Sequence, residues 1–284
     1  MNRQLLSVYG LKWNPFSPEL PSEALQWTPP IEHFAWRVEN MTREGGFALI
    51  SGEVGSGKSV AERLVSERLS KNSDLWVREL SRPQARICDF YRELGELFGL
   101  TVSPNNRWIG TKSLRERWAS HIESVHMRPV VLIDEAQEMP PSVLSELRLL
   151  ASSHFDAHKL LTVVLCGDQR MIAKLETPDL LPVLSRIRAR LMLESLPAQD
   201  MTRHIKAMFV AAGNPQLMTS ELVTTLTEHA AGNWRALMNM GHELLEAAAH
   251  RELAKLDEKL FLEVFAVPPT LRPVTKATAT RGKR

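Results

Sequence analysis

Short apolar runs alternate with longer stretches of mixed polarity over the first two thirds of the chain. The runs are nearly continuous, which is typical of strands buried on both faces, and the stretches between them have helical spacing. Strands are expected at residues 47–50, 75–80, 130–133, 161–165 and 190–193. Strands that alternate with helices in this way predict an α/β fold with a parallel sheet flanked by helices, ending near Leu196.

After Pro197 only helical periodicity remains, with helices expected at about residues 198–212, 219–231, 234–250 and 257–265. In the third of these helices the apolar residues fall on one face: Trp234, Leu237, Met238, Leu244, Leu245 and Ala248. The pattern therefore predicts a second, small helical domain. The expected segments are a lead-in packing on the core (1–44), the α/β domain (45–196), the helical lid (197–267) and a basic disordered tail (268–284).

Composition narrows the class of protein. With 284 residues, of which 44% are hydrophobic, the chain can bury a substantial core. It has no apolar run of about 18 residues and no apolar secretory leader, so we expect a cytoplasmic protein that does not contact a membrane. The net charge is only +2, but residues 268–284 hold five basic and no acidic residues. Cys88 and Cys166 lack metal-ligand spacing and are expected to be buried apolar residues.

The first predicted strand leads into Gly52-Glu53-Val54-Gly55-Ser56-Gly57-Lys58-Ser59, followed by Val60, which fits the phosphate-loop pattern at every fixed position. The glycines let several backbone N–H groups turn toward an anion. Lys58 is expected to contact the β- and γ-phosphates, and the Ser59 hydroxyl to bind Mg²⁺. The alternative is a strand-turn-helix corner with a chance match. Upstream, either the lead-in packs beside the nucleotide base, or Trp13, Pro15 and Phe16 only fasten the N-terminus to the core.

Asp134-Glu135 follows the third predicted strand directly. Ligands of open parallel sheets bind at the carboxyl ends of the strands, so this acidic pair is expected beside the phosphate loop. We assign Asp134 to the metal and Glu135 to the attacking water of a hydrolytic site. The alternative is that both residues only cap the helix expected near Pro140.

Four further residues fit the same kind of site, each with a plainer alternative. Asp168 follows the fourth strand and either faces the γ-phosphate or caps the next helix. Arg186, or as second choice Arg188, could stabilise a phosphoryl group bound by a neighbouring subunit, although either could be a surface residue. Arg235 opens a lid helix and either reaches the γ-phosphate or lies on the surface.

In this order and spacing, the motifs resemble an AAA+ ATPase, a P-loop NTPase with a helical lid. Within that superfamily, Tyr9-Gly10-Leu11, Asn14-Pro15-Phe16 and Asp134-Glu135-Ala136-Gln137 resemble the ExeA-like branch, which includes ExeA-type secretion ATPases and transposition helpers of the TniB, TnsC and MuB type. The resemblance implies Asp168 as sensor 1, Arg186 as arginine finger and Arg235 as sensor 2. Asp168-Gln169-Arg170 departs from the Gln-Pro-Glu common in secretion-type members.

A free-standing ATPase core with a basic end is similar to the transposition helpers. The resemblance implies ATP and Mg²⁺ as cofactors, a homo-oligomeric ring or filament on double-stranded DNA, and a partner transposase. DNA would be held through its phosphates, and the candidate contacts are Arg107, Lys112, Arg115 and Arg117. Such charges are also common on solvated helix faces. The alternatives are a secretion-type motor that acts on proteins and a nucleotide-dependent scaffold or switch.

Overall fold

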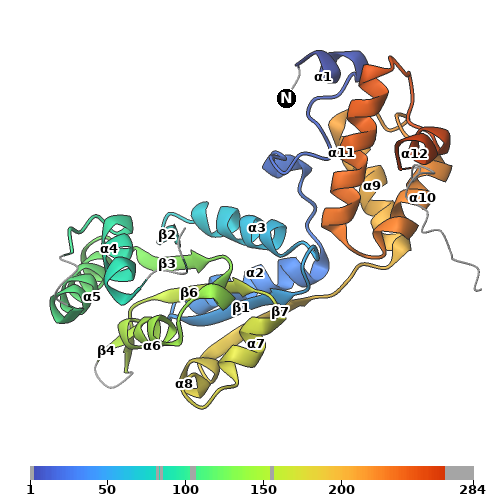
Figure 1. Ribbon diagram of the computed structural model, residues 1–284. Coiled ribbons are helices and arrows are strands. Elements are labelled where there is room, and N and C mark those ends of the chain that lie inside the picture. Colours follow the sequence, from blue (N-terminus) through green and yellow to red (C-terminus); the bar gives the residue numbers. More distant parts are fainter. Residues whose placement is uncertain (1–2, 81–82, 84–85, 103–106, 154–156, 266–284) are drawn as a thin grey trace, which may run out of the picture.

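The computed structural model describes residues 3–80, 83, 86–102, 107–153 and 157–265 (Figure 1). The basic tail expected at 268–284 lies outside the described residues. The centre of the molecule is a five-stranded parallel sheet with the strand order β2-β3-β6-β1-β7. These strands are β1 (Gly46–Gly52), β2 (Leu75–Leu80), β3 (Arg128–Ile133), β6 (Thr162–Gly167) and β7 (Ile187–Leu193). The predicted α/β fold class is confirmed.

Helices cover both faces of the sheet, which explains the near-continuous apolar strands. Alternate residues of a strand point to opposite faces, so Phe47 and Leu49 join one apolar cluster while Ala48 and Ile50 join another. One face is covered by α2 (Pro29–Thr42) and α3 (Lys58–Ser70). The other face carries α4 (Ile87–Leu97), α5 (Arg107–Ser124), α6 (Pro141–Leu150), α7 (Gln169–Leu175) and α8 (Leu181–Leu184). A two-stranded ribbon, β4 (Ser152–Ser153) with β5 (His158–Lys159), follows α6.

The helices after the sheet form a separate cluster with its own apolar core (Figure 1). These helices are α9 (Ala198–Ala212), α10 (Ser220–Ala230), α11 (Trp234–His250) and α12 (Glu258–Phe265). We call this cluster the lid. It follows β7 in the chain.

The lead-in differs from the expectation that all of residues 1–44 would pack on the core. Its first part, with α1 (Arg3–Tyr9), joins the lid, where Tyr9 and Phe16 are buried. A Cβ on Gly241 of α11 would lie 2.3 Å from the Phe16 ring, so the ring fills a groove that only glycine leaves open. The second part, from Leu20 through the 3₁₀ turn η1 (Ser22–Ala24) to α2, packs on the sheet. The lead-in thus contacts both domains because its aromatic residues find their apolar partners in the lid.

The two cysteines occupy different environments. Cys166 is buried in β6, whereas Cys88 is exposed on α4, and both are free thiols. The expectation of burial was wrong for Cys88 because α4 is amphipathic and buries Phe90, Tyr91 and Leu94 instead. Within the described residues, no helix is both long and apolar enough to cross a membrane.

Candidate nucleotide-binding site

The phosphate loop lies between the carboxyl end of β1 and the first turn of α3. Gly55 and Gly57 have φ angles of +84° and +95°, which side chains with a Cβ rarely adopt. Gly57 is the N-cap of α3, so the positive end of that helix dipole faces the loop. Backbone donors of this kind form a preformed anion-binding concavity.

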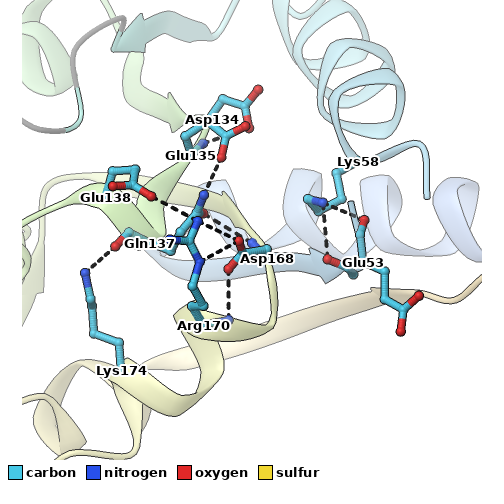
Figure 2. Close-up of polar contacts among 10 residues, drawn as sticks. Glu53, Lys58, Asp134, Glu135, Gln137, Glu138, Asp168, Arg170 and Lys174 are labelled. Carbon is cyan, nitrogen blue, oxygen red and sulfur yellow. Dashed lines mark hydrogen bonds and ion pairs between the residues drawn. The ribbon is translucent and has the colours of Figure 1, made fainter. Parts of the chain in front are cut away.

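Two side chains of α3 point from its first turn toward the loop and the sheet edge. The Lys58 ammonium donates to the carbonyl oxygens of Gly52 and Glu53 at 3.2 and 2.8 Å, as Figure 2 shows for Glu53 and Lys58. The Ser59 hydroxyl donates to Asp134 Oδ2 at 3.3 Å. Residues 75 positions apart are therefore brought together, as the sequence spacing had indicated.

Asp134 and Glu135 follow the buried strand β3. The other Asp134 oxygen, Oδ1, accepts a hydrogen bond from the Glu135 backbone at 2.7 Å. Glu135 has a φ angle of +51°, uncommon for a residue with a side chain, and its carboxylate accepts from the amide of Gln137. The acidic pair lies ahead of the 3₁₀ turn η2 (Ala136–Glu138), while α6 begins only at Pro141. Neither residue caps α6, which has no side-chain cap.

The residues present fit a nucleoside triphosphate and a hard divalent cation. The oxygens of Ser59 and Asp134 converge within hydrogen-bond distance, and hydroxyl and carboxylate oxygens are the donors that Mg²⁺ prefers. Ser56 Oγ in the loop is buried and has no hydrogen-bond partner among the described residues. Lys58 supplies a positive charge at the same place, and it forms no ion pair within the part of the chain that the structure describes.

Asp168, at the carboxyl end of β6, is the N-cap of α7. Its carboxylate accepts from the Arg170 backbone and from Arg170 Nε, both at 2.8 Å, and Arg170 also pairs with Glu138 at 3.0 Å. Burial alone would raise the pKa of Asp168, but the hydrogen bonds and charge of Arg170, with the charge of Lys58, lower it overall. The capping alternative thus describes the observed contacts. Gly167, which precedes Asp168, pairs with Ser51 of β1, and this pairing brings Asp168 to the edge of the sheet where the phosphate loop begins.

Arg186 and Arg188 lie at the opposite edge of the sheet. The pairing of Phe47 with Ile187 puts them beside the amino end of β1, whereas the phosphate loop follows its carboxyl end. A strand of seven residues spans roughly 20 Å. Arg186 donates to the Pro182 carbonyl at 2.6 Å, and Arg188 pairs with Glu44 at 2.7 Å. Neither arginine therefore reaches the phosphate loop of its own chain.

The lid contacts the phosphate loop directly through the start of α11. The Trp234 N–H donates to the Gly55 carbonyl at 2.9 Å, and the Asn233 amide donates to the Val54 carbonyl at 3.4 Å. A Cβ on Gly55 would lie 2.1 Å from Asn233 Oδ1, so this close approach also requires glycine. Arg235 follows Trp234 and is exposed, and its role at the γ-phosphate stays a prediction.

The four candidate DNA contacts all lie on α5, at the end of the α/β domain farthest from the lid (Figure 1). Three of them are engaged within the protein. Arg107 pairs with buried Glu146, Arg115 donates to the Leu149 carbonyl, and the Arg117 guanidinium lies 5.7 Å from the centre of the Trp76 ring. Lys112 is more open: it is 3.7 Å from exposed Glu116 and 5.6 Å from the ring of exposed Trp108.

Sequence reasoning missed two polar residues of this site. Glu62, one turn after Ser59 on α3, converges with Asp134 and Cys166, whose ligand atoms all lie within 4.8 Å of one another. Burial, followed by repulsion from Asp134, raises the pKa of Glu62 to about 8, although a hydrogen bond with Cys166 opposes the shift. The helical spacing from Ser59 was a signal for Glu62. Gln137 links Glu135 to Asp168. The sequence Asp134-Glu135-Ala136-Gln137 did not by itself predict these contacts.

Three similarities to known proteins accompany this geometry. Residues 41–175 match the family model described as AAA domain. The chain is 32% identical over 216 residues to General secretion pathway protein A of Aeromonas hydrophila, which covers 75% of the chain and 39% of that protein. It is 25% identical over 224 residues to ATP-dependent target DNA activator B of Escherichia phage Mu, which covers 77% of the chain and 65% of that protein. The chain thus spans less than two thirds of the length of each relative.

Among solved structures, Cdc6p from Pyrobaculum aerophilum is similar with a TM-score of 0.68 and 14% identity, over 85% of the chain and 67% of that protein. At this level of identity the likeness concerns the fold, and it agrees with the sheet order and the C-terminal helices. The phosphate loop, the acidic pair after β3 and the lid on the loop are the parts of a P-loop NTPase. Residues 41–175 are therefore an AAA domain, and the chain has the AAA+ P-loop NTPase fold.

Proposed function

We propose that this protein is a Mg²⁺-dependent ATPase that assembles on double-stranded DNA and regulates transposition, recruiting or activating a partner transposase in the cytoplasm. The observation that carries the proposal is a full phosphate-loop site, with the lid docked on it, in a chain similar to a phage protein named as an ATP-dependent target DNA activator. The partner and the substrate class rest on that similarity, and the chemistry rests on the site.

Each residue of the site has a role in ATP hydrolysis. Lys58 and the backbone donors of the loop hold the β- and γ-phosphates, and Arg235 reaches the γ-phosphate from the lid. Ser59 and Asp134 would hold Mg²⁺, which neutralises charge on the phosphate oxygens when bound. Glu135 accepts a proton from the attacking water, and Asp168 orients that water from the end of β6.

Arg186 and Arg188 lie roughly 20 Å along the sheet from their own phosphate loop, so neither serves as the finger within its own subunit. In the proposed oligomer the finger acts on the nucleotide of a neighbouring subunit. Mixing subunits tests this directly: Arg186→Ala lacks the finger and Lys58→Ala lacks the loop cation, so we expect their mixture to regain hydrolysis that neither variant shows alone. Arg188→Ala is the matched control for the choice of arginine, and a mixture without regained hydrolysis would contradict the intersubunit role.

On the DNA-binding face, Lys112 is the strongest of the four candidates because its charge is the least committed within the protein. Arg107, Arg115 and Arg117 contribute to the positive potential around it. Contacts of this kind are made to phosphates and are independent of sequence, so affinity should fall steeply with salt.

The test is assembly on a non-specific duplex, measured by fluorescence anisotropy at several salt concentrations and by electron microscopy. We expect binding and oligomers with ATP or a non-hydrolysable analogue and little of either with ADP. Glu135→Gln should bind ATP, hydrolyse it slowly and remain longer on DNA. A chain that stays monomeric with ATP and shows no salt-sensitive DNA binding would overturn the proposal.

A second candidate is a motor ATPase of the secretion type that acts on protein partners. It is favoured by the 32% identity to General secretion pathway protein A, which exceeds the identity to the target DNA activator. The same assay separates the two candidates, because a secretion-type motor should hydrolyse ATP without ATP-dependent assembly on the duplex.

A further inference from the structure

The buried side chain of Gln137 bridges two groups that come from different strands. Its Nε2 donates to the Glu135 carboxylate after β3, and its Oε1 accepts from the Asp168 N–H after β6 at 3.2 Å. Figure 2 shows the Gln137 side chain lying between Glu135 and Asp168. Only 5% of the residue is exposed, so water does not compete freely for either contact.

The two partners determine which residue type can form this bridge. A carboxylate oxygen only accepts, and a backbone N–H only donates, so the bridging side chain must carry one donor and one acceptor at a fixed separation. An amide meets this condition. Glutamate at this position would keep the acceptor for Asp168 but place a second carboxylate against Glu135. Methionine would supply no donor and only a weak acceptor.

Gly167 leaves space for the Gln137 side chain, and Lys174 binds the Gln137 backbone. A Cβ on Gly167 would lie 2.8 Å from Gln137 Oε1, so the amide oxygen occupies the space that this glycine leaves. Lys174 of α7 donates to the carbonyl oxygens of Gln137 and Met139, the latter at 2.9 Å, which ties η2 to α7. The amide therefore has little freedom to turn away.

We propose that Gln137 is a positioning residue that holds the Glu135 carboxylate in its hydrolytic orientation and couples it to the end of β6. One Glu135 oxygen is bound by the Gln137 amide, which leaves the other to accept the proton of the attacking water. A rotation about the Glu135 side chain would lose the amide contact, so the bridge selects one orientation. This inference rests on the proposed hydrolytic function, because it assigns a role through Glu135.

Steady-state hydrolysis and binding of a fluorescent ATP analogue, measured on the full chain, test the bridge. We expect Gln137→Met to lower kcat by roughly 10- to 100-fold, as misplacement of a catalytic group does, while the Kd for the analogue changes less than about twofold. Gln137→Glu should lose at least as much kcat although it retains the contact with Asp168. Gln199→Met makes the same chemical change at an exposed position of α9 and should leave kcat unchanged.

A double-mutant cycle separates positioning from a structural role. In the Glu135→Gln background there is no base left to orient, so adding Gln137→Met should change the residual rate less than about twofold. An equal loss of rate in both backgrounds, or a parallel loss of nucleotide binding and thermal stability, would overturn the proposal. If the wild type hydrolyses ATP and Gln137→Met does so at the same rate, only the positioning role of Gln137 is overturned. If the wild type does not hydrolyse ATP, the positioning role and the proposed function are overturned together.

Discussion

The carboxyl edge of the sheet and the α5 flank both gather charged residues, but they use the charges differently. At the carboxyl edge, Lys58 contacts only backbone carbonyls, and Arg235 has no side-chain partner within the described part of the chain. On α5, Arg107 neutralises the buried carboxylate of Glu146, and Arg117 lies over an indole ring. Charges on α5 thus serve the fold to a large extent.

The difference shows how a cation in a sequence should be weighed. A basic residue that neutralises a buried acid cannot be removed without cost to stability. If a variant of such a residue loses function, the loss is therefore weak evidence that the residue binds a ligand. A basic residue beside a preformed anion concavity, with only carbonyl contacts, is available for the ligand. By this criterion the phosphate loop and Lys112 are the more informative places to change.

The largest effect is expected at the phosphate loop. Lys58→Ala should weaken ATP binding and hydrolysis by about 100-fold or more, since it removes a cation that faces the phosphates in a partly desolvated site. Titration calorimetry with an ATP analogue and a phosphate-release assay measure both. Lys206→Ala, an exposed lysine on α9, is the matched control. If Lys58→Ala bound ATP with unchanged affinity, the phosphate loop would not differ from α5 in having a cation available for a ligand.

On the α5 flank, the expected effect is on stability. Arg107→Ala leaves buried Glu146 with the Tyr91 hydroxyl, at 2.6 Å, as its remaining side-chain partner among the described residues, and should lower the free energy of unfolding by about 2–3 kcal/mol. Arg107 is itself more than half exposed, so the effect is at the lower end for a buried pair. Lys112→Ala should change stability by less than about 0.5 kcal/mol in urea denaturation. If Lys112→Ala also left DNA binding and its salt dependence intact, α5 would not be the DNA face.

Glu62 provides a test that depends on pH. Its pKa is raised from 4.5 to about 8, first by burial and then by Asp134, so the folded chain holds a proton that the unfolded chain releases between these values. The free energy of unfolding should therefore fall as pH rises through this window. Glu62→Gln has no carboxyl group to titrate and should lack this pH dependence, which in the wild type amounts to about 1.4 kcal/mol per pH unit inside the window. Urea midpoints without nucleotide and metal measure it, and parallel pH profiles would contradict the assignment.

The smallest expected effect concerns lid docking. Asn233 caps α11 and also contacts the loop, so Asn233→Ala should lose about 1 kcal/mol of stability and raise the KM for ATP severalfold. Thr219→Ala removes the equivalent cap of α10, away from the loop, and should lower stability without changing KM. Equal KM values in the two variants would mean that the contact of Asn233 with Val54 contributes nothing to nucleotide binding.

The local patterns in the chain determined the sheet, the helical lid and the place of the phosphate loop. Apolar runs identify strands buried on both faces. Gly52 and Lys58 belong to one loop after one strand, and Asp134 directly follows another strand, so each motif can be recognised within its own short stretch of sequence. Parallel strands bring their carboxyl ends to one edge, so the meeting of Ser59 with Asp134 followed from the fold class.

Only the tertiary structure decided which side chains are partners across elements. Phe16 packs in the lid because Gly241 leaves a groove there, and Arg107 pairs with Glu146. Gln137 lies between Glu135 and Asp168. These contacts join residues on different helices and strands, and periodicity along one element carries no information about them. Whether a charged residue serves the fold or a ligand is set by such long-range contacts, which is why the sequence could name the site but not the partners within it.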